Sequence, residues 1–459
     1  MKKYLKPLIG CLILLGAMIV NVYAQKQDSK KLNITIYNQD FGLIQEIRSL
    51  SVPEGQSQIR LNGISHQVIP GSILIRFDGE VIDQTYHQQT ANLSHILKTY
   101  FLNKKIDLVG NSGRSVSGIL TAITGGQAVI QKKDGTFAII PNVFSYQLNV
   151  DQMPAGATFN PYLECSIKSK KKGKTDFDLS YQTRGLQWYA IYSAVVNTSY
   201  NRMDLNADAY VRNYTGADYK NAHVNLMAGD INVQNRIPQP HFEAMAQVAK
   251  STDQTISEKP FSDYHLYTIS HPVDLPENSS KQLNLFKATN ISIQRKYVYQ
   301  SQNIGAAGKS SEGKIGVTIS FINNKANHLD KPMPAGKVNI YKKDGKHLIL
   351  IGQVQMGHTP AESHLKWNVG NAFDLTAKET LKKIKHISNR VTDRTYEIKF
   401  KNQQKKDVTI QVDRNIGSHG EVMDASQKYE KVDATTVRFE VPVKSKGEQT
   451  LSFTVRNSY

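Results

Sequence analysis

The chain is poor in cysteine, in acidic side chains and in long apolar runs. Its 459 residues include two cysteines and 39 Asp and Glu against 57 Lys and Arg, a formal charge of +18. This balance excludes an acidic, calcium-chelating surface. One continuous apolar run is present, from Leu8 to Val20, which excludes a multi-span membrane protein. Because 39% of the residues are hydrophobic, the chain should form about two to four domains with real cores.

The first 24 residues have the pattern of a secretory signal peptide. Three basic residues, Lys2, Lys3 and Lys6, precede the apolar run, and small or apolar residues follow it. We predict cleavage after Ala24 and no transmembrane segment in the remaining chain. A retained anchor is the alternative, but the run is shorter than the roughly 20 residues that span a bilayer. A lipoprotein signal at Cys11 is not favoured, because the apolar core follows that cysteine instead of preceding it.

Removal of this peptide leaves Cys165 as the one remaining cysteine. An intramolecular disulfide is then impossible, so we expect stability to come from buried apolar surface. The thiol lies close to several lysines in the sequence, which could lower its pKa and make it a nucleophile. A buried structural cysteine is the favoured interpretation.

Short alternating apolar runs predict a mainly β fold. One such run places Leu32, Ile34 and Ile36 on the same face of a strand, and the 22 Tyr, 15 Phe and 30 Gly suit strands and turns. We expect immunoglobulin-like β-sandwich domains with an inserted small barrel. The predicted segments are a signal peptide (1–24), an N-terminal β segment (25–90), a helix-plus-barrel insert (91–150), central β-sandwich strands (151–232), a mobile linker or loop (233–262) and a C-terminal β-sandwich region (263–459).

The insert carries the one clear helical pattern. Apolar residues recur at helical spacing over residues 91–103. Five short strand candidates follow, divided by turn-forming Asn, Asp and Gly residues. One short helix followed by five tightly connected strands predicts a small barrel of the SH3 or Sm type.

Motifs for nucleotide binding and nucleophilic catalysis are incomplete. The segment 307–310 ends like a P-loop, but Asn303 stands where the first glycine is needed and no buried strand leads into it. The segment 110–114 breaks the Gly-x-Ser-x-Gly pattern at its last position and lies in a predicted hairpin. We therefore assign no catalytic or cofactor-binding residue.

Metal ligands and paired carboxylates are equally weak signals. His358, His364 and Asp374 could converge across a hairpin, but they lack a recognised ligand spacing, so surface or turn positions are favoured. Asp176 and Asp178 share a predicted strand face beside a lysine cluster, where solvated charge pairing is the favoured role. No metal or other cofactor is predicted.

Clusters of lysine are the strongest compositional feature. With the signal peptide removed, 54 basic side chains face 39 acidic ones. The densest cluster comprises Lys168, Lys170, Lys171, Lys172 and Lys174. Export makes nucleic acid an improbable partner, so an anionic polysaccharide or lipid headgroup is the natural polyanion. A solvated hairpin turn is the competing interpretation of the same residues.

Several motifs occur together in an order that resembles a known family. They are the segments 37–43, 178–192, 213–222, 227–230, 319–324, 329–337, 341–345, 358–360 and 372–374. In this respect the chain is similar to the family of domain of unknown function 4139. The resemblance implies an exported bacterial protein of β-sandwich build, and some such proteins are labelled mucoidy inhibitor A-like. It implies no established activity, substrate or catalytic residue.

Together these features predict an exported cell-envelope protein, either periplasmic or associated with the outer surface. Its leading role is a non-catalytic binding or scaffolding module whose partner is an envelope protein or an anionic polymer. A hydrolase acting on envelope glycans is the first alternative, with carboxylates converging from separate strands. A polyanion-docking protein that uses the lysine clusters is the second, and steep salt dependence would distinguish it.

Overall fold

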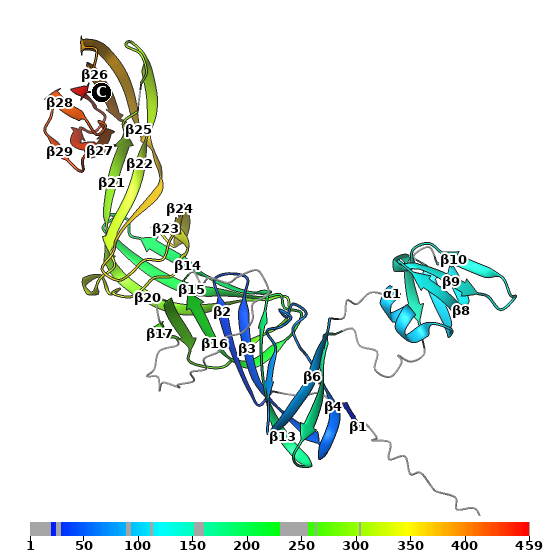
Figure 1. Ribbon diagram of the computed structural model, residues 1–459. Helices are drawn as coiled ribbons and strands as arrows, with labels where there is room; N and C mark the ends of the chain where they lie inside the picture. The colour runs from blue at the N-terminus through cyan, green and yellow to red at the C-terminus, as the bar shows by residue number, and fades with distance from the viewer. Residues whose placement is uncertain are drawn as a thin grey trace, which may run out of the picture.

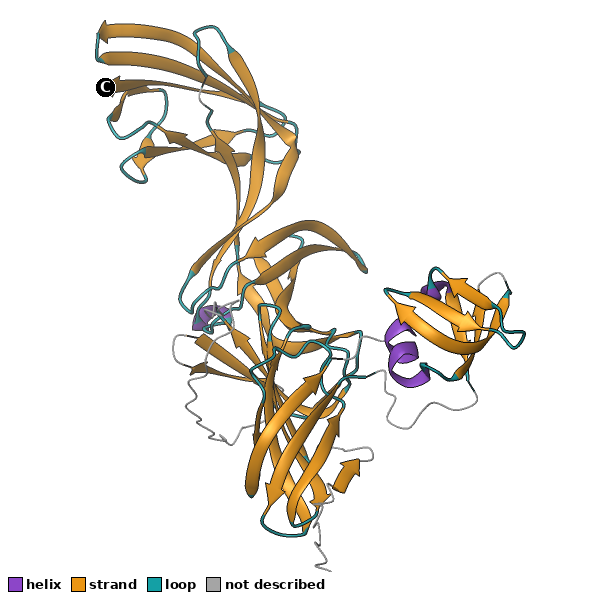
Figure 2. Ribbon diagram, turned by 45° about the vertical axis from the view of Figure 1, so that its right-hand side comes forward, coloured by secondary structure: helices purple, strands orange, loops and turns teal. Residues whose placement is uncertain are grey.

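The structure is a computed structural model that describes residues 20–23, 29–88, 93–110, 113–150, 160–229, 256–261, 264–302 and 304–458. Strands make up 68% of it and helices 4%, which confirms the mainly β prediction (Figures 1 and 2). Most of the predicted signal peptide, including Ala24, lies outside the described residues. Among the described residues, no helix combines the length and apolarity that crossing a bilayer requires.

Three sheets form the body of the molecule, which we define by their strands. The largest of these three sheets has the order β17-β18-β16-β2-β3-β13-β5, with β19 beside β16. Its strands are β2 (Lys31–Tyr37), β3 (Gly42–Val52), β5 (Leu74–Arg76), β13 (Gly173–Thr183), β16 (Tyr219–Ala228), β17 (Ile256–Phe261), β18 (Tyr264–Ile269) and β19 (Val273–Leu275). The second sheet comprises β1 (Val20–Tyr23), β4 (Gly55–Asn62), β12 (Tyr162–Ser169) and β6 (Gly79–His87), in the order β1-β4-β12-β6.

The third sheet of the body has the order β20-β15-β14-β23-β24, and we call it the third sheet throughout. Its strands are β14 (Leu186–Val196), β15 (Arg202–Asn213), β20 (Ser279–Ser292), β23 (Gly336–Asp344) and β24 (His347–Met356). Burial alternates strictly along β14, so that Trp188, Ala190 and Tyr192 face the core while Tyr189 and Ile191 face outward. The inward side chains of all three sheets belong to one hydrophobic cluster.

The predicted small barrel is present. It comprises α1 (Leu93–Ile96), the π-turn η1 (Leu97–Phe101), β7 (Lys105–Gly110), β8 (Ser115–Thr124), β9 (Gln127–Gln131), β10 (Phe137–Ile140), the 3-10 turn η2 (Val143–Ser145) and β11 (Tyr146–Asn149). The sheet order is β10-β9-β8-β7-β11, and the barrel (cyan in Figure 1) has its own core around Leu97, Leu108 and Leu120. The helical part ends at Phe101, before the end of the predicted span 91–103, because Leu102 leaves the helical region with a ψ of 131°. Residues 91–92 of that span lie outside the described residues.

A nine-stranded sheet, which we call the C-terminal sheet, completes the fold. Its order is β28-β31-β26-β25-β22-β21-β27-β30-β29. The strands are β21 (Gln294–Gln300), β22 (Ser310–Ile322), β25 (His364–Ser388), β26 (Val391–Asn402), β27 (Val408–Asn415), β28 (Gly420–Ala425), β29 (Tyr429–Lys431), β30 (Thr436–Val443) and β31 (Glu448–Ser458). Buried side chains of its own strands form a hydrophobic core separate from that of the body.

Two long strands join the C-terminal sheet to the body. One end of β22 buries Ile319 in the core of the body, whereas Ile315 lies in the core of the C-terminal sheet. In the same way β25 contributes Trp367 to the first core and Leu375 to the second. Figure 1 shows these strands running from the body to the far end of the molecule. A short 3-10 turn, η3 (Lys325–Asn327), follows β22.

Two segments differ from their sequence-based assignments. Residues 256–261, assigned to the linker 233–262, form β17, which pairs with β18 in an antiparallel hairpin. Residues 233–255 and 262 of that linker lie outside the described residues. The segment 263–459, treated as one C-terminal region, divides between the body and the C-terminal sheet. The reason is that β20 pairs with β15 and β23 pairs with β14, so both strands complete a sheet begun earlier in the chain.

Candidate functional site

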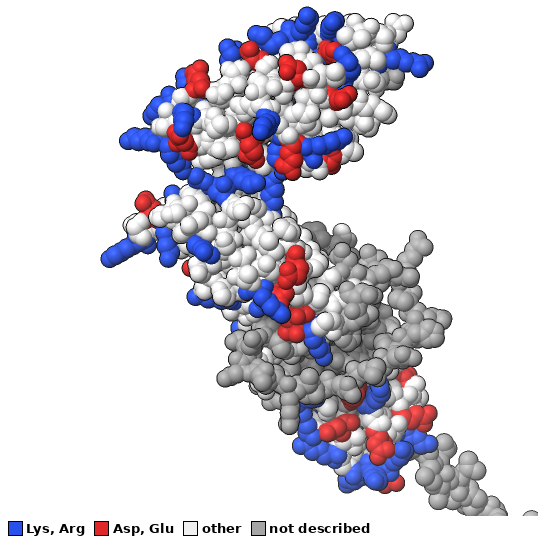
Figure 3. All heavy atoms as spheres, turned by 90° about the vertical axis from the view of Figure 1, so that its left-hand side faces the viewer, with Lys and Arg blue, Asp and Glu red and all other residues white. Residues whose placement is uncertain are grey.

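The lysine cluster predicted to contact polyanions lies in the hairpin between β12 and β13. All five lysines are exposed, and Lys170 Nζ forms an ion pair of 2.9 Å with Asp78 Oδ1. The hydrogen bond from Lys170 and its charge lower the pKa of Asp78. Lys30 Nζ likewise lies 2.8 Å from Asp176 Oδ1 at this end of the body. Figure 3 shows basic and acidic side chains mixed there, as in a solvated charged turn.

Cys165 is fully buried on β12. Burial, followed by the charges of Asp83 and Glu164, raises the pKa of its thiol to about 12. The nearby lysines therefore do not activate it, since only the thiolate is a nucleophile. The interpretation of Cys165 as a structural residue fits this environment.

The other sequence candidates do not assemble into sites. Gly308 and Lys309 hydrogen-bond to the backbone of Leu381 on β25, which makes the segment 307–310 part of a loop and not a phosphate cradle. Gly110 and Arg114 close the hairpin between β7 and β8, while residues 111 and 112 lie outside the described residues. No group of three or more His, Cys, Asp and Glu side chains among the described residues could hold a metal ion.

A hollow of about 520 Å³ lies where β14 and β23 meet the loop after β24. We call it the β14–β23 hollow. Its lining residues are Asn38, Trp188, Tyr189, Ala335, Gly336, Lys337, Gln355, Gly357 and His358. Its volume falls within the range of small-ligand sites, roughly 300 to 1,000 Å³.

Close packing of two parallel strands forms one wall of the hollow. Ala190 of β14 lies opposite Gly336 of β23. A Cβ atom added to Gly336 would lie 2.1 Å from the carbonyl oxygen of Ala190, so this position needs glycine. The register that follows places Lys337 beside Ile191 and across from Gln355 on β24. Both Lys337 and Gln355 are exposed.

The floor of the hollow is held by side chains that join three distant segments. Asn38 Nδ2 donates to the carbonyl of Trp188 at 3.3 Å, and Asn38 Oδ1 accepts from the amide of Gly229 at 3.2 Å. The fully buried indole of Trp188 donates from Nε1 to the carbonyl of Met227 at 2.9 Å. These bonds satisfy buried polar groups that would otherwise destabilise the fold.

The rim of the hollow carries groups that can donate hydrogen bonds to a ligand. His358 Nδ1 accepts from the backbone amide of Ala335 at 3.2 Å, so the neutral ring carries its proton on Nε2. The ammonium of Lys337 and the amide of Gln355 lie on neighbouring strands. Among the described residues that line the hollow, none carries a carboxylate. The rim is therefore basic and rich in donors.

Tyr189 extends the hollow onto the outer face of the third sheet. Its ring lies 5.2 Å from that of Tyr210 on β15. Arg212 donates from Nη2 to the hydroxyl of Tyr189 at 3.3 Å, and its guanidinium lies 5.5 and 5.4 Å from the two ring centres. The guanidinium fixes both rings through hydrogen bonding and cation–π attraction.

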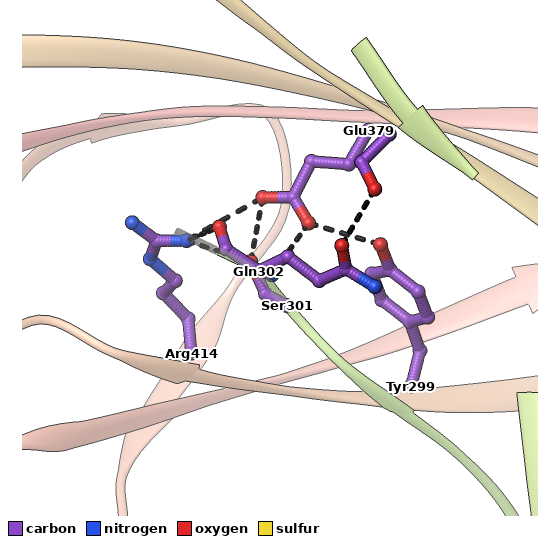
Figure 4. A network of polar contacts seen from close by, with 6 residues as sticks. Tyr299, Ser301, Gln302, Glu379 and Arg414 are labelled. Carbon is purple, nitrogen blue, oxygen red and sulfur yellow. Dashed lines mark hydrogen bonds and ion pairs between the residues drawn. The ribbon is translucent and has the colours of Figure 1, made fainter. Parts of the chain in front are cut away.

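A second polar grouping surrounds Glu379 in the C-terminal sheet (Figure 4). The carboxylate of Glu379 is fully buried and accepts hydrogen bonds from Tyr299, Ser301, the amide of Gln302 and Arg414. We call these five residues the Glu379 network. Arg414, itself 4% exposed, also lies 4.0 Å from the ring centre of Tyr396. Because its groups bond to one another, this network stabilises the fold and is not accessible to a ligand.

A further hollow of about 340 Å³ lies between β21 and β27. It contains Arg295, Lys296 and Lys406 together with Asp407 and Glu440. Asp407 pairs with Lys444 at 2.8 Å. The mixed charge gives this hollow no preference for a ligand of either sign.

The comparison with known families agrees with the motifs quoted above. Residues 177–459 match the family described as domain of unknown function (DUF4139). The chain belongs to this family. No curated protein matches it. The DUF4139 match includes every residue that lines the hollow except Asn38.

Sequence reasoning did not identify the β14–β23 hollow as a site, although its residues lie in the motifs that carry the resemblance to DUF4139. Asn38 belongs to the segment 37–43, Trp188 to 178–192, Lys337 to 329–337 and His358 to 358–360. The fold brings these four motifs to one place. The sequence feature that indicates this site is therefore the joint occurrence of these four motifs, and not a spacing of catalytic residues.

Proposed function

We propose that this DUF4139 protein is exported to the cell envelope and binds an envelope component as a non-catalytic binding or scaffolding module. The β14–β23 hollow is its binding site. The observation that carries the proposal is the convergence of four separate motifs on a hollow whose rim offers Lys337, Gln355 and His358 to solvent. Polar side chains that are exposed and gathered in a concavity are typical of ligand sites.

Support for export comes from the sequence pattern of residues 1–24. Cleavage after Ala24 would also remove β1, which pairs in parallel with β4, and would make β4 an edge strand of its sheet. The test is to express the full chain with a C-terminal tag in a bacterial host and to sequence the N-terminus of the exported product. We expect it to begin at Gln25. Ala24→Trp should block processing, whereas Lys26→Ala should not.

The binding proposal is tested with the exported protein and fractionated envelope polysaccharides and proteins. We expect retention of one fraction by the unaltered protein and loss of that retention in a Lys337→Ala, Gln355→Ala double variant. Lys171→Ala, Lys172→Ala serves as the matched control, because these exposed lysines lie in the β12–β13 hairpin. Loss in the control pair alone would favour polyanion docking by the lysine cluster, and shortening of a glycan would favour the hydrolase. Either result contradicts the proposal.

A further inference from the structure

The outer face of the third sheet carries a row of three amides and one hydroxyl, which we call the amide row, and it leads away from the β14–β23 hollow. Four neighbouring strands each contribute one residue to the row, and each residue lies opposite the next. They are Gln353 on β24, Asn339 on β23, Ser193 on β14 and Asn206 on β15. Gln353 Nε2 donates to Asn339 Oδ1 at 2.7 Å. Four neighbouring strands span about 14 Å, which is long enough for several linked sugar rings and too long for one small metabolite.

The buried acidic side chain on this face, Asp208, is already occupied. Asp208 accepts hydrogen bonds from the amides of Asn206 at 2.7 Å, Gln282 at 2.8 Å and Asn284 at 2.9 Å. It is 6% exposed. The carboxylate therefore orients three amides and presents little charge to solvent. Asn206 Oδ1 also accepts from Asn284 Nδ2 at 2.7 Å.

The basic groups on the same surface remain available. Lys337 is exposed and has no ion pair with a described carboxylate, and the protonated Nε2 of His358 is a donor at the other side of the hollow. Beside them, Tyr189 and Tyr210 present half-buried rings. Such rings offer an apolar surface with a polar handle, which suits the C–H face and hydroxyl groups of a sugar.

We propose that the β14–β23 hollow and this amide row bind an acidic oligosaccharide segment of an extracellular polysaccharide. The carboxylate of one sugar lies at Lys337 and His358, the preceding ring lies against Tyr189, and the following hydroxyl groups bond to the amide row. This proposal rests on the proposed binding function and specifies its ligand. Charge complementarity favours an acidic glycan over a neutral one, since the rim has the ammonium of Lys337, the donor Nε2 of His358 and no carboxylate.

Other polymers fit this surface less well. An extended peptide gains affinity by pairing its backbone with a sheet edge, whereas the amide row crosses the face of the third sheet. A nucleic acid would need several phosphate contacts from basic side chains. Amide side chains outnumber cations along the row, and this composition matches a polymer with many hydroxyl groups and few charges.

The test measures binding of the full chain, as purified, to defined oligosaccharides by isothermal titration calorimetry. The probes are hexamers of galacturonic, glucuronic and mannuronic acid, their methyl esters, and a neutral glucan hexamer. We expect at least one acidic hexamer to bind at least tenfold more tightly than its methyl ester, because the ester removes the charge and keeps the rings. Lys337→Ala should weaken the acidic hexamer about tenfold and leave the ester unchanged.

Two further variants distinguish the roles of charge and rings. Tyr189→Ala should weaken both the acidic hexamer and its ester, since the ring contacts the sugar and not the carboxylate. Lys343→Ala is the matched control, because Lys343 is exposed on the same strand as Lys337. Equal affinity for acid and ester, or equal losses in the Lys337 and Lys343 variants, would overturn the proposal.

The result also separates this inference from the function on which it rests. If none of the acidic hexamers binds in a Lys337-dependent manner while an envelope fraction is still retained through Lys337 and Gln355, the acidic-glycan inference is wrong and the binding function stands. If the double variant retains every envelope fraction as well as the unaltered protein does, both are wrong.

Discussion

The Glu379 network and the rim of the β14–β23 hollow both gather polar side chains on sheets, but they differ in where those side chains find partners. Glu379 is fully buried and accepts from Tyr299 at 3.0 Å, from Ser301 at 2.7 Å and from the amide of Gln302 at 2.9 Å. Lys337 and Gln355, in contrast, are exposed and face solvent across the hollow. The carboxylate of the first grouping is satisfied within the protein, whereas the donors of the second are open to solvent.

This difference separates a structural role from a binding role. Removing one member of a buried pair leaves an uncompensated charge, so the cost falls on the fold. Removing an exposed lysine costs the fold little, because water replaces its partners. The presence of charged side chains does not distinguish the two groupings, whereas their burial and hydrogen bonding do. Variants of each should therefore affect different measurements.

The largest effect is expected for Glu379→Leu. This change leaves the buried guanidinium of Arg414 without its carboxylate, and we expect a loss of about 3 to 5 kcal/mol in the free energy of unfolding of the C-terminal sheet. Hydrogen exchange followed by mass spectrometry can assign the loss to β21, β25 and β27, which carry the network. Glycan binding at the distant hollow should remain unchanged.

Glu397→Gln is the control for that experiment. Glu397 forms an ion pair of 3.5 Å with Lys382, whose side chain is 52% exposed. Exposed pairs of this kind contribute about 0 to 1 kcal/mol. Equal destabilisation by the changes at Glu379 and Glu397 would show that the buried network has no special role in stability.

An intermediate effect is expected for Trp188→Phe, because Trp188 contributes both to the fold and to the hollow. Trp188 is a core residue whose backbone also lines the hollow. The change removes the indole donor to Met227 and some buried volume, so we expect a loss of about 2 kcal/mol in the free energy of unfolding. Binding should weaken too, because the lost indole volume and the lost bond to Met227 let the backbone at position 188 shift, and its carbonyl accepts from Asn38 in the floor. Chemical denaturation and glycan titration of one preparation would measure both.

A smaller, pH-dependent effect is expected at Asp393 on β26. The hydrogen bonds from Arg456, at 2.7 and 2.8 Å, and its charge hold the pKa of Asp393 below its ordinary value near 3.8. A depressed pKa in the folded state stabilises the protein above the unfolded-state value, and this contribution is lost as the pH falls through the folded-state value. Asp393→Asn should therefore lower the melting temperature at pH 6, and by progressively less as the pH falls below 3.8. A difference that does not shrink as the pH falls would contradict this.

Local pattern was sufficient to predict individual strands and the barrel. Alternating burial along β14 and β15 follows directly from alternating apolar residues. In the barrel, short turns determine the pairing of β7, β8, β9 and β10, and β11 returns to pair with β7. Pairing between distant strands was not predictable, because the parallel contact of Ala190 with Gly336 joins residues far apart in the chain.

The same limit explains why the candidate site was missed. Asn38, Trp188, Lys337 and His358 have no spacing that indicates a shared site, and the sheet order alone brings them together. Lysine clusters were easy to see because their members are adjacent in sequence. In the structure that adjacency produces an exposed hairpin, where Lys170 pairs with Asp78. The density of lysines along the sequence was therefore a poorer indicator of the candidate site than the convergence of separate motifs in the fold.

The smallest effect on stability is expected for Lys337→Ala, and this makes it the most informative variant for the comparison. Lys337 is exposed on β23, and its removal should change the free energy of unfolding by no more than about 0.5 kcal/mol. The same change should cause the largest loss of acidic-glycan binding. Lys337→Ala should therefore keep its melting temperature and lose affinity for the acidic glycan, whereas Trp188→Phe should lose both. If Lys337→Ala instead melts several degrees lower, its side chain belongs to the fold, and the contrast between a satisfied network and an open rim fails at its central residue.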